Sequence, residues 1–244
     1  MIHVRPLATV PEFQRAVELQ REIWQFDEIE ILPVRLFVVA AKVGGQVFGA
    51  FDGGRMIGFC IAIPGVKPAG TSYLHSDMLG VLPGYRDRGV GRMLKLAQRD
   101  DALARGMHLI EWTFDPLEIK NARFNLERLG AVVRRYVLNQ YGVTTSQLHA
   151  GLPTDRCVAE WHLASPRVAS RLAGVSGPQP EVLARIQIPL DVETLHHHQP
   201  RRALEFQRRT SEQFVEFLGH GWAVTGLETT ADAAVYLFTR WESS

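Results

Sequence analysis

The feature that most constrains this chain is the segment His75–Asp100, in which a predicted strand, a turn and a predicted helix follow one another directly. The strand pattern ends at Val81, and the turn after it contains Gly89 and Gly91. From there, apolar residues recur at helical spacing as far as Gly106, a predicted C-cap. We therefore predict an α/β fold in which this turn lies between a strand and an amphipathic helix.

The turn has the chemistry of a phosphate site. Glycines let backbone N–H groups approach a ligand because no Cβ stands in the way. A helix N-terminus adds partial positive charge and unpaired donors, and Arg86, Arg88 and Arg92 add charged donors. An ordinary tight turn before a helix is the alternative interpretation. A Rossmann fingerprint is excluded because Leu94 occupies its third glycine position, and the Gly-Lys-Ser/Thr of a P-loop is absent.

The spacing Arg86-Asp87-Arg88-Gly89-Val90-Gly91, preceded by Val81-Leu82-Pro83-Gly84-Tyr85, resembles the acyl-CoA signature of the GNAT (Gcn5-related N-acetyltransferase) superfamily. The order of predicted elements agrees with that family over about residues 1–165. The resemblance implies an α/β fold with a GNAT-type mixed, splayed sheet flanked by helices. Residues 166–244 would then form a C-terminal α/β extension that packs on the core and helps to wall the acceptor pocket or a dimer interface.

The resemblance also implies a reaction, N-acyl transfer from acetyl-CoA or another acyl-CoA to the amine of a small molecule such as an amino acid. The phrases EWTFDPL, NARFNLERLGA and PTDRCVAEW are similar to a GNAT branch with an extended C-terminus, for which succinyl-CoA is an alternative donor. By the same resemblance the cofactor-binding residues are Leu79, Gly80, Val81, Arg86, Asp87, Arg88, Gly89, Val90, Gly91, Arg92, Asn121 and Asn125. A sensor or scaffold that binds acyl-CoA without turnover is the competing function.

Three residues are candidates for the base that deprotonates the amine. Strand periodicity predicts that Tyr73, His75, Asp77, Leu79 and Val81 share one face, and GNAT enzymes often place a base at the positions of His75 and Asp77. Histidine suits neutral pH, whereas an aspartate needs a raised pKa. The rival base is Glu111 on the next strand, which an ion pair would explain equally. Backbone N–H groups near residues 79–81 would meet the oxyanion.

The general acid departs from the family pattern, because Leu126 replaces the tyrosine found in many GNAT enzymes. Unassisted departure of the thiolate, Tyr136, Tyr141 or a water molecule are the alternatives. Arg156 is the candidate for binding a substrate carboxylate through its forked guanidinium, with an ion pair as the structural alternative.

Elsewhere the sequence gives short-range signals. Thr9 and Glu12 predict a capping box, 28–43 is ambiguous between helix and loop, and 64–70 reads as a loop. Further predictions are a hairpin of strands 46–51 and 55–63, a helix over 117–129, strands over 108–114, 131–141 and 156–163, and, after a linker at 174–180, a strand over 182–190, a helix over 200–218 and strands over 222–227 and 234–239.

Composition limits the remaining functions. A formal net charge of +1 argues against nucleic acid as a partner. We expect no metal, because the consecutive His196, His197 and His198 lack the spacing of a helical zinc site and Cys60 and Cys157 stand alone. Two cysteines and apolar runs too short for a bilayer predict a cytoplasmic protein without a membrane partner. A homodimer is the alternative to a monomer.

Overall fold

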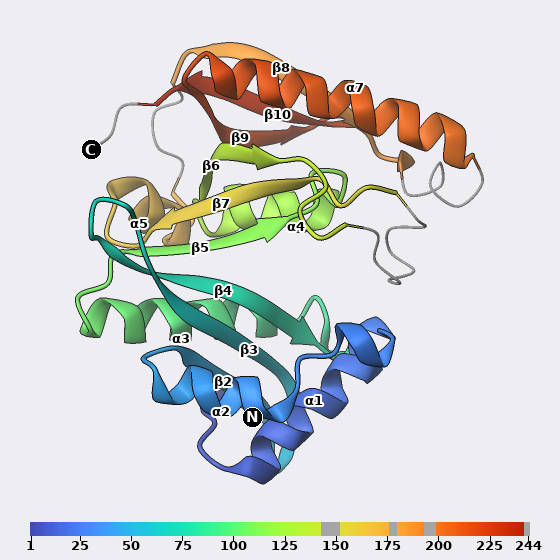
Figure 1. Cartoon of the computed structure of the whole chain (residues 1–244). Coiled ribbons are helices and arrows are strands. Elements are labelled where there is room, and N and C mark those ends of the chain that lie inside the picture. The colour runs from blue at the N-terminus through green and yellow to red at the C-terminus, as the bar shows by residue number, and fades with distance from the viewer. Residues whose placement is uncertain (143–151, 176–179, 193–198, 242–244) are drawn as a thin grey trace. The chain divides into compact units, whose positions relative to one another are not determined.

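The computed structural model describes residues 1–142, 152–175, 180–192 and 199–241 (Figure 1). The chain divides into two compact units, Met1–Glu111 and Trp112–Ser244. Strand β5, Leu109–Phe114, crosses this division. The sequence predicted a different boundary, near residue 165, between an acyl-CoA-binding core and a C-terminal extension. That functional boundary stays a prediction.

The first unit is a mixed sheet with helices on both faces. Its elements are β1 (Ile2–Pro6), α1 (Val10–Trp24), η1 (Glu28–Glu30), α2 (Val34–Lys42), β2 (Gln46–Asp52), β3 (Arg55–Val66), β4 (Ser72–Val81), η2 (Pro83–Tyr85), α3 (Val90–Ala104) and the beginning of β5. The strands lie in the order β1-β2-β3-β4-β5. Strands β1 to β4 pair antiparallel, and β4 pairs parallel with β5. The predicted α/β class with a mixed sheet is confirmed.

Local signals explain most of these elements. The Thr9 hydroxyl accepts a hydrogen bond from the Glu12 N–H and the Glu12 carboxylate accepts one from the Thr9 N–H, which confirms the capping box of α1. The ambiguous stretch resolves into η1 and α2. The predicted loop over 64–70 is partly wrong, because β3 continues to Val66. Gly65 permits this, since a Cβ there would lie 2.5 Å from the ring of Tyr73 on β4.

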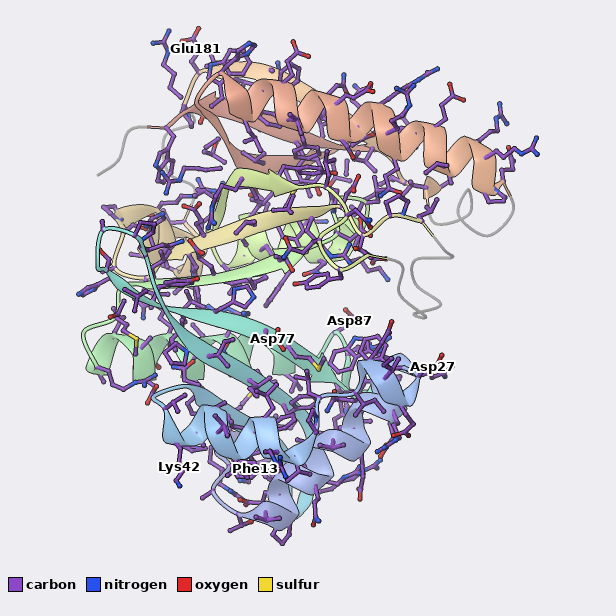
Figure 2. The ribbon with its side chains drawn as sticks, in the orientation of Figure 1. Phe13, Asp27, Lys42, Asp77, Asp87 and Glu181 are labelled. Carbon is purple, nitrogen blue, oxygen red and sulfur yellow. The ribbon has the colours of Figure 1, made fainter. Side chains whose placement is uncertain are left out.

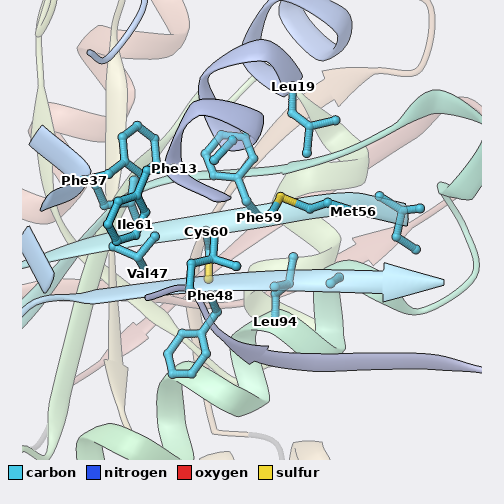
Figure 3. Close-up of a cluster of buried hydrophobic side chains, with 14 of the residues drawn as sticks. Phe13, Leu19, Phe37, Val47, Phe48, Met56, Phe59, Cys60, Ile61 and Leu94 are labelled. Atoms are coloured by element: carbon cyan, nitrogen blue, oxygen red, sulfur yellow. The ribbon is translucent and has the colours of Figure 1, made fainter. Parts of the chain in front are cut away.

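Side chains from both faces of the sheet form the core of this unit (Figure 3). On one face, Phe59 of β3 packs against Phe37 of α2 and Trp24 of α1. The next residue, Cys60, points to the opposite face because side chains alternate along a strand, and there it lies near Lys95 of α3. Helices α1 and α2 therefore cover one face of the sheet and α3 covers the other.

The second unit contains the remainder of β5 and the elements that follow it. These are α4 (Ile119–Arg123), the π-helix η3 (Phe124–Arg128), β6 (Val132–Val137), β7 (Arg156–His162), α5 (Pro166–Leu172), β8 (Val182–Pro189), α7 (Pro200–Gly219), β9 (Trp222–Thr229) and β10 (Ala233–Arg240). Its strands lie in the order β5-β7-β6-β9-β10-β8. The strands and the helix predicted beyond residue 180 are confirmed.

Two helical details of this unit differ from the sequence prediction. The helix predicted over 117–129 begins later, at Ile119, and widens into a π-helix before Gly130, which has a φ of +78°. Helix α5 was not predicted, although Ser165 caps it and Pro166 occupies its first position. That pair of residues is a recognised start signal for a helix and would have revealed it.

Candidate functional site

A β-bulge interrupts strand β4 at Asp77. In the register between β3 and β4, Ile61 lies opposite Met78 and Ala62 lies opposite Ser76. Asp77 therefore stands between two paired residues without a partner of its own in the ladder. Such an extra residue bends the strand and changes the direction of its side chains, and bulges are frequent beside active sites.

The bulge overturns the prediction that five residues of β4 share one face. Residues directly opposite in an antiparallel pair place their side chains on the same face. Tyr73, His75 and Met78 lie opposite Gly65, Ile63 and Ile61, which alternate regularly along β3 and so share one face. By the same rule Leu79 and Val81, opposite Cys60 and Gly58, lie on the other face. The inserted residue shifts the period-two pattern by one position.

Asp77 is an exposed side chain whose charge is nonetheless disfavoured (Figure 2). Protein atoms around its carboxylate restrict solvation and raise its pKa above the usual range, while the nearby His75 lowers it. His75 itself is half-buried on β4, opposite Ile63 of β3. The structure thus brings the two predicted base residues into electrostatic contact.

Glu111, the rival base, is held in an ion pair. Its side chain is buried, and its Oε1 lies 2.5 Å from Nζ of Lys67. Lys67 also lies over the ring of Tyr73, with Nζ 4.4 Å from the ring centroid. The structural alternative considered for Glu111 is therefore realised. The backbone at Glu111 pairs with His75, and beyond this point no further β4–β5 pair is found in the described residues.

The turn between β4 and α3 is built on left-handed backbone conformations. Asp87 has a φ of +59° and Gly89 a φ of +78°. Gly89 is the N-cap of α3, and no side chain caps the helix there. A Cβ at Gly91 would meet only a methyl carbon of Leu79, at an ordinary 3.7 Å. Packing within the protein therefore does not require glycine at position 91, whereas close approach by a ligand would.

The arginines of this turn are available at the surface. Arg86 and Arg88 are exposed, and Arg92 is partly buried on the first turn of α3. Arg86 donates a hydrogen bond of 3.4 Å to the carbonyl oxygen of Val81, and the Arg88 guanidinium lies 5.3 Å from the ring centroid of Tyr85. The predicted positive environment at the N-terminus of α3 is present.

A buried polar cluster joins α3 to Ser76, the residue that precedes Asp77 in β4. Lys95 Nζ donates to the hydroxyl of Ser76 at 2.9 Å, and that hydroxyl lies 3.1 Å from Oε1 of Gln98. Burial lowers the pKa of Lys95 to about 7, and Cys60 opposes this shift. Sequence reasoning missed the cluster. The available signal was the placement of Lys95 and Gln98 within the apolar stripe of α3, one helical turn from Gly91 and Leu94.

The predicted residues of the second unit lie in its own interior and on its surface. Asn125 is buried and donates a hydrogen bond of 3.2 Å to the side-chain oxygen of Asn121. Leu126, at the position of the family tyrosine, is fully buried. Contact of Asn121 or Asn125 with a cofactor stays a prediction.

The two candidate tyrosines have different surroundings. The Tyr136 hydroxyl lies 2.9 Å from that of Ser211 on α7, which in turn donates to Asp155 at 2.6 Å, and burial raises the pKa of Tyr136. Tyr141 is exposed, and its hydroxyl lies 2.8 Å from that of Thr113.

Arg156 is engaged within the second unit. Its guanidinium lies 3.6 Å from the Asp115 carboxylate and 5.7 Å from the ring centroid of Tyr141. The side chain is buried. The ion pair that was the structural alternative for Arg156 is therefore present, and a substrate carboxylate would have to share this guanidinium.

Two further kinds of site are absent from the part of the chain that the structure describes. Within residues 1–142, 152–175, 180–192 and 199–241, no three His, Cys, Asp or Glu side chains are arranged to hold a metal ion. The histidines at 196–198 lie outside these ranges. None of the helices in the same ranges has the length and apolar character needed to cross a bilayer.

Comparison with solved structures supports the fold. The structure is similar to the ribosomal-protein-S18-alanine N-acetyltransferase from Escherichia coli, with a TM-score of 0.53 and 18% identity over 68% of this chain and 96% of that one. It is also similar to Arabidopsis thaliana NAA60 in complex with acetyl-CoA, with a TM-score of 0.56 and 15% identity over 68% of this chain and 100% of that one. At these identities the similarity establishes the fold alone.

Comparison of sequences identifies the family. No curated protein matches the chain. Residues 11–131, which contain the β4 bulge and the turn before α3, match the model of the acetyltransferase (GNAT) family. By this match, residues 11–131 form a domain of the acetyltransferase (GNAT) family, and the similar solved structures agree with its fold.

Proposed function

We propose that this protein is an acyl-CoA-dependent N-acyltransferase that moves an acetyl group, or alternatively a succinyl group, to the amine of a small molecule such as an amino acid. The observation that carries the proposal is the turn at Gly89–Gly91. It combines a helix N-terminus without a side-chain cap, a glycine that protein packing does not require, and exposed arginines. This is the arrangement that a pyrophosphate needs.

The donor would lie along β4. Its pyrophosphate accepts hydrogen bonds from the first backbone N–H groups of α3 and from Arg86, Arg88 or Arg92. Its thioester carbonyl is polarised by backbone N–H groups of residues 79–81, a part of β4 for which no β5 pairing is found in the described residues. Donors fixed in a strand cost no reorganisation when charge develops on the carbonyl oxygen.

The amine would lose its proton to Asp77 or His75, directly or through water. The raised pKa of Asp77 supports this role, because an ordinary aspartate is too weak a base at neutral pH. The ion pair with Lys67 occupies one of the two carboxylate oxygens of Glu111. Glu111 is therefore the weaker candidate.

Release of the CoA thiolate would follow collapse of the tetrahedral intermediate. Leu126 cannot donate a proton, and burial makes the Tyr136 hydroxyl a weaker acid than usual. Among the candidates, the exposed Tyr141 hydroxyl and water remain as proton donors, alongside unassisted departure of the thiolate.

The similar structure from Escherichia coli is, by name, an enzyme that acetylates an alanine of a ribosomal protein. The choice between a small-molecule and a protein acceptor therefore requires a direct test. We favour a small amine, and Arg156 would share its charge with the substrate carboxylate.

Calorimetric titration with acetyl-CoA and succinyl-CoA, followed by a thiol-release assay over amino acids, other small amines and peptide N-termini, tests the proposal. We expect binding of one donor and turnover with a small amine. Binding without turnover across the panel would favour the sensor alternative. Turnover confined to peptides would assign a protein acceptor.

A further inference from the structure

The second unit contains a pocket that acyl transfer as proposed above does not use. The pocket has a volume of about 460 Å³ and lies between helix α5 and strands β9 and β10. All of its lining residues belong to Trp112–Ser244. A volume of this size is within the range of small-molecule sites.

The pocket forms where two strands separate. In the described residues, β6 and β9 pair only at Val133 and Val224. Beyond that pair, backbone groups of β9 form hydrogen bonds with side chains and not with a neighbouring strand. The Leu227 N–H donates to the Glu127 carboxylate at 2.9 Å, and the Thr225 carbonyl accepts a hydrogen bond from Arg167. Thr225 is also the unpaired residue of a bulge between β9 and β10, which opens the sheet edge further.

Arg167 is held in a fixed orientation at this edge. Its Nε donates to the carbonyl of Gly130 at 3.0 Å, and its Nη2 donates to the carbonyls of Leu126 and Thr225. Its Nη1 has no hydrogen bond to any residue that the structure describes. Neutral carbonyls fix the guanidinium without neutralising it, so a preorganised cationic donor lines the pocket.

The charges around Arg167 leave one positive charge in excess, although the Glu127 carboxylate attracts its guanidinium. Arg171 forms an ion pair of 2.9 Å with Glu127 Oε2, and Glu127 Oε1 is already occupied by the N–H of Leu227. Two guanidiniums thus share one carboxylate, each of whose oxygens already accepts a hydrogen bond or forms an ion pair. Burial, and then the repulsion of Arg171, lower the pKa of Arg167 to about 10. The fourth charged residue of the lining, Glu228, is exposed and solvated.

We propose that this pocket binds a small molecule that has one carboxylate and an apolar body. The carboxylate accepts hydrogen bonds from Nη1 of Arg167. The body lies against Val182, Leu227 and Leu237, which also line the pocket. Arg171 and Glu127 form an ion pair, so the net charge beside the ligand is the single positive charge of Arg167. One positive charge favours a monoanion over the phosphate dianion.

Titration calorimetry of the full chain with octanoate tests the proposal, with octanamide and inorganic phosphate as matched probes. We expect octanoate to bind with a Kd near or below about 1 mM, and both other probes to bind at least tenfold more weakly. Ser170→Trp should fill the pocket from α5 and weaken octanoate at least tenfold, because Ser170 lines it and takes no part in holding Arg167. Ala169→Trp, on the exposed side of the same helix, is the control and should leave the affinity unchanged.

Four results would overturn the proposal. Equal binding of octanamide would mean that the pocket recognises only apolar surface, and tighter binding of phosphate would mean a different class of anion. Octanoate binding that survives Ser170→Trp, or no octanoate binding at about 10 mM, would mean that the pocket is not the site. Circular dichroism of both tryptophan variants confirms that the comparison is made between folded proteins.

Discussion

At the scale of one residue, a substitution at Gly91 tests whether the turn before α3 binds the pyrophosphate of acetyl-CoA. We predict that Gly91→Glu abolishes acetyl-CoA binding, because the new carboxylate would occupy and repel the pyrophosphate position at the N-terminus of α3. The fold should survive, since a Cβ at this position meets only Leu79 at 3.7 Å. Titration calorimetry measures the affinity, and circular dichroism measures the fold.

Gly54→Glu is the matched control. It makes the same change in the β2–β3 hairpin, where a Cβ would have nothing within 4 Å. We expect that variant to bind acetyl-CoA like the unmodified protein. Unchanged affinity in folded Gly91→Glu would contradict the assignment of this turn to the cofactor.

The proposed base is a second test at the same scale. We predict that Asp77→Ala or His75→Ala lowers kcat at least tenfold with little change in acetyl-CoA affinity, since loss of a general base typically costs 10²–10⁴ in rate. Activity should recover partly at high pH, where more amine is already neutral. Because the protein atoms around its carboxylate restrict solvation and raise the pKa of Asp77, the acidic limb of the unmodified enzyme should lie above the pH at which an ordinary aspartate titrates.

A pH–rate profile of each variant distinguishes the candidates. Glu111→Ala should have the smaller effect on kcat, because Glu111 is engaged with Lys67. If only Glu111→Ala removes the acidic limb, the base lies on β5. If all three variants keep the limb, the amine titrates alone or the base lies elsewhere.

At the residue level, the sequence was sufficient to locate the turn before α3, because the positive φ of Gly89 and the exposed charges of Arg86 and Arg88 are local properties. That these residues bind acyl-CoA stays a prediction. The bulge at Asp77 was not predictable, because it results from pairing with β3 and leaves no mark in the composition of β4. The same reason explains why Leu79 and Val81 were assigned to the wrong face.

At the scale of elements, α3 carries an energetic cost at Lys95. A folded-state pKa near 7, below the ordinary 10.5, means that the folded protein binds fewer protons than the unfolded chain between these pH values. Stability therefore rises with pH across this window, and the cost is fully present below about pH 7. We predict that Lys95→Met raises the free energy of unfolding by on the order of a few kcal/mol at pH 6, and by less at pH 9.

Urea unfolding at both pH values measures this difference, with Lys42→Met on the exposed end of α2 as the control (Figure 2). The control should change stability by no more than about 0.5 kcal/mol at either pH. A Lys95→Met gain that is equal at pH 6 and pH 9 would mean that the ammonium is charged in the fold throughout this range.

Elements with a complete local signal were predicted, and those shaped by tertiary packing were not. The capping box of α1 and the glycine turn between β2 and β3 are short-range signals, and the structure contains both the capped helix and the hairpin. The extension of β3 through Pro64 and Gly65 depends on the Tyr73 ring of a neighbouring strand. The π-helix after α4 likewise has no periodicity that distinguishes it from an α-helix over so few residues.

For the whole molecule, we predict that the chain cannot be shortened to Gly174 without loss of stability. Such a truncation removes the N–H of Leu227 that Glu127 accepts, the Ser211 hydroxyl beside Tyr136, and the hydroxyl of the fully buried Tyr236 that donates to Pro116. It also removes the Phe214 ring that stacks on Tyr136, so apolar surface that is now covered would be exposed to water, at a cost of about 25 cal/mol for each Å². Thermal unfolding, solubility and thiol release measure the outcome. A soluble, stable and fully active truncated protein would contradict the proposed role of residues 166–244.

The family and the fold class were predictable for the whole molecule because one turn and the order of elements carry them. The acceptor and the acyl chain were not, since they depend on which side chains distant parts of the sequence bring together. Arg167 is an example. Its surroundings come from η3, α5 and β9, and no motif links these segments in the sequence.

The bulge of β4 has a consequence for how selection acts on this strand. If Asp77 were deleted, Ser76 and Met78 would become neighbours, and both would keep their present partners on β3 in regular alternation. The sheet therefore has no need of a residue at this position. Mutational drift would be expected to erase such an insertion unless some task other than folding preserved it. A protein that lacks Asp77 should therefore keep its sheet, and any activity that it loses would show the task for which the residue is retained.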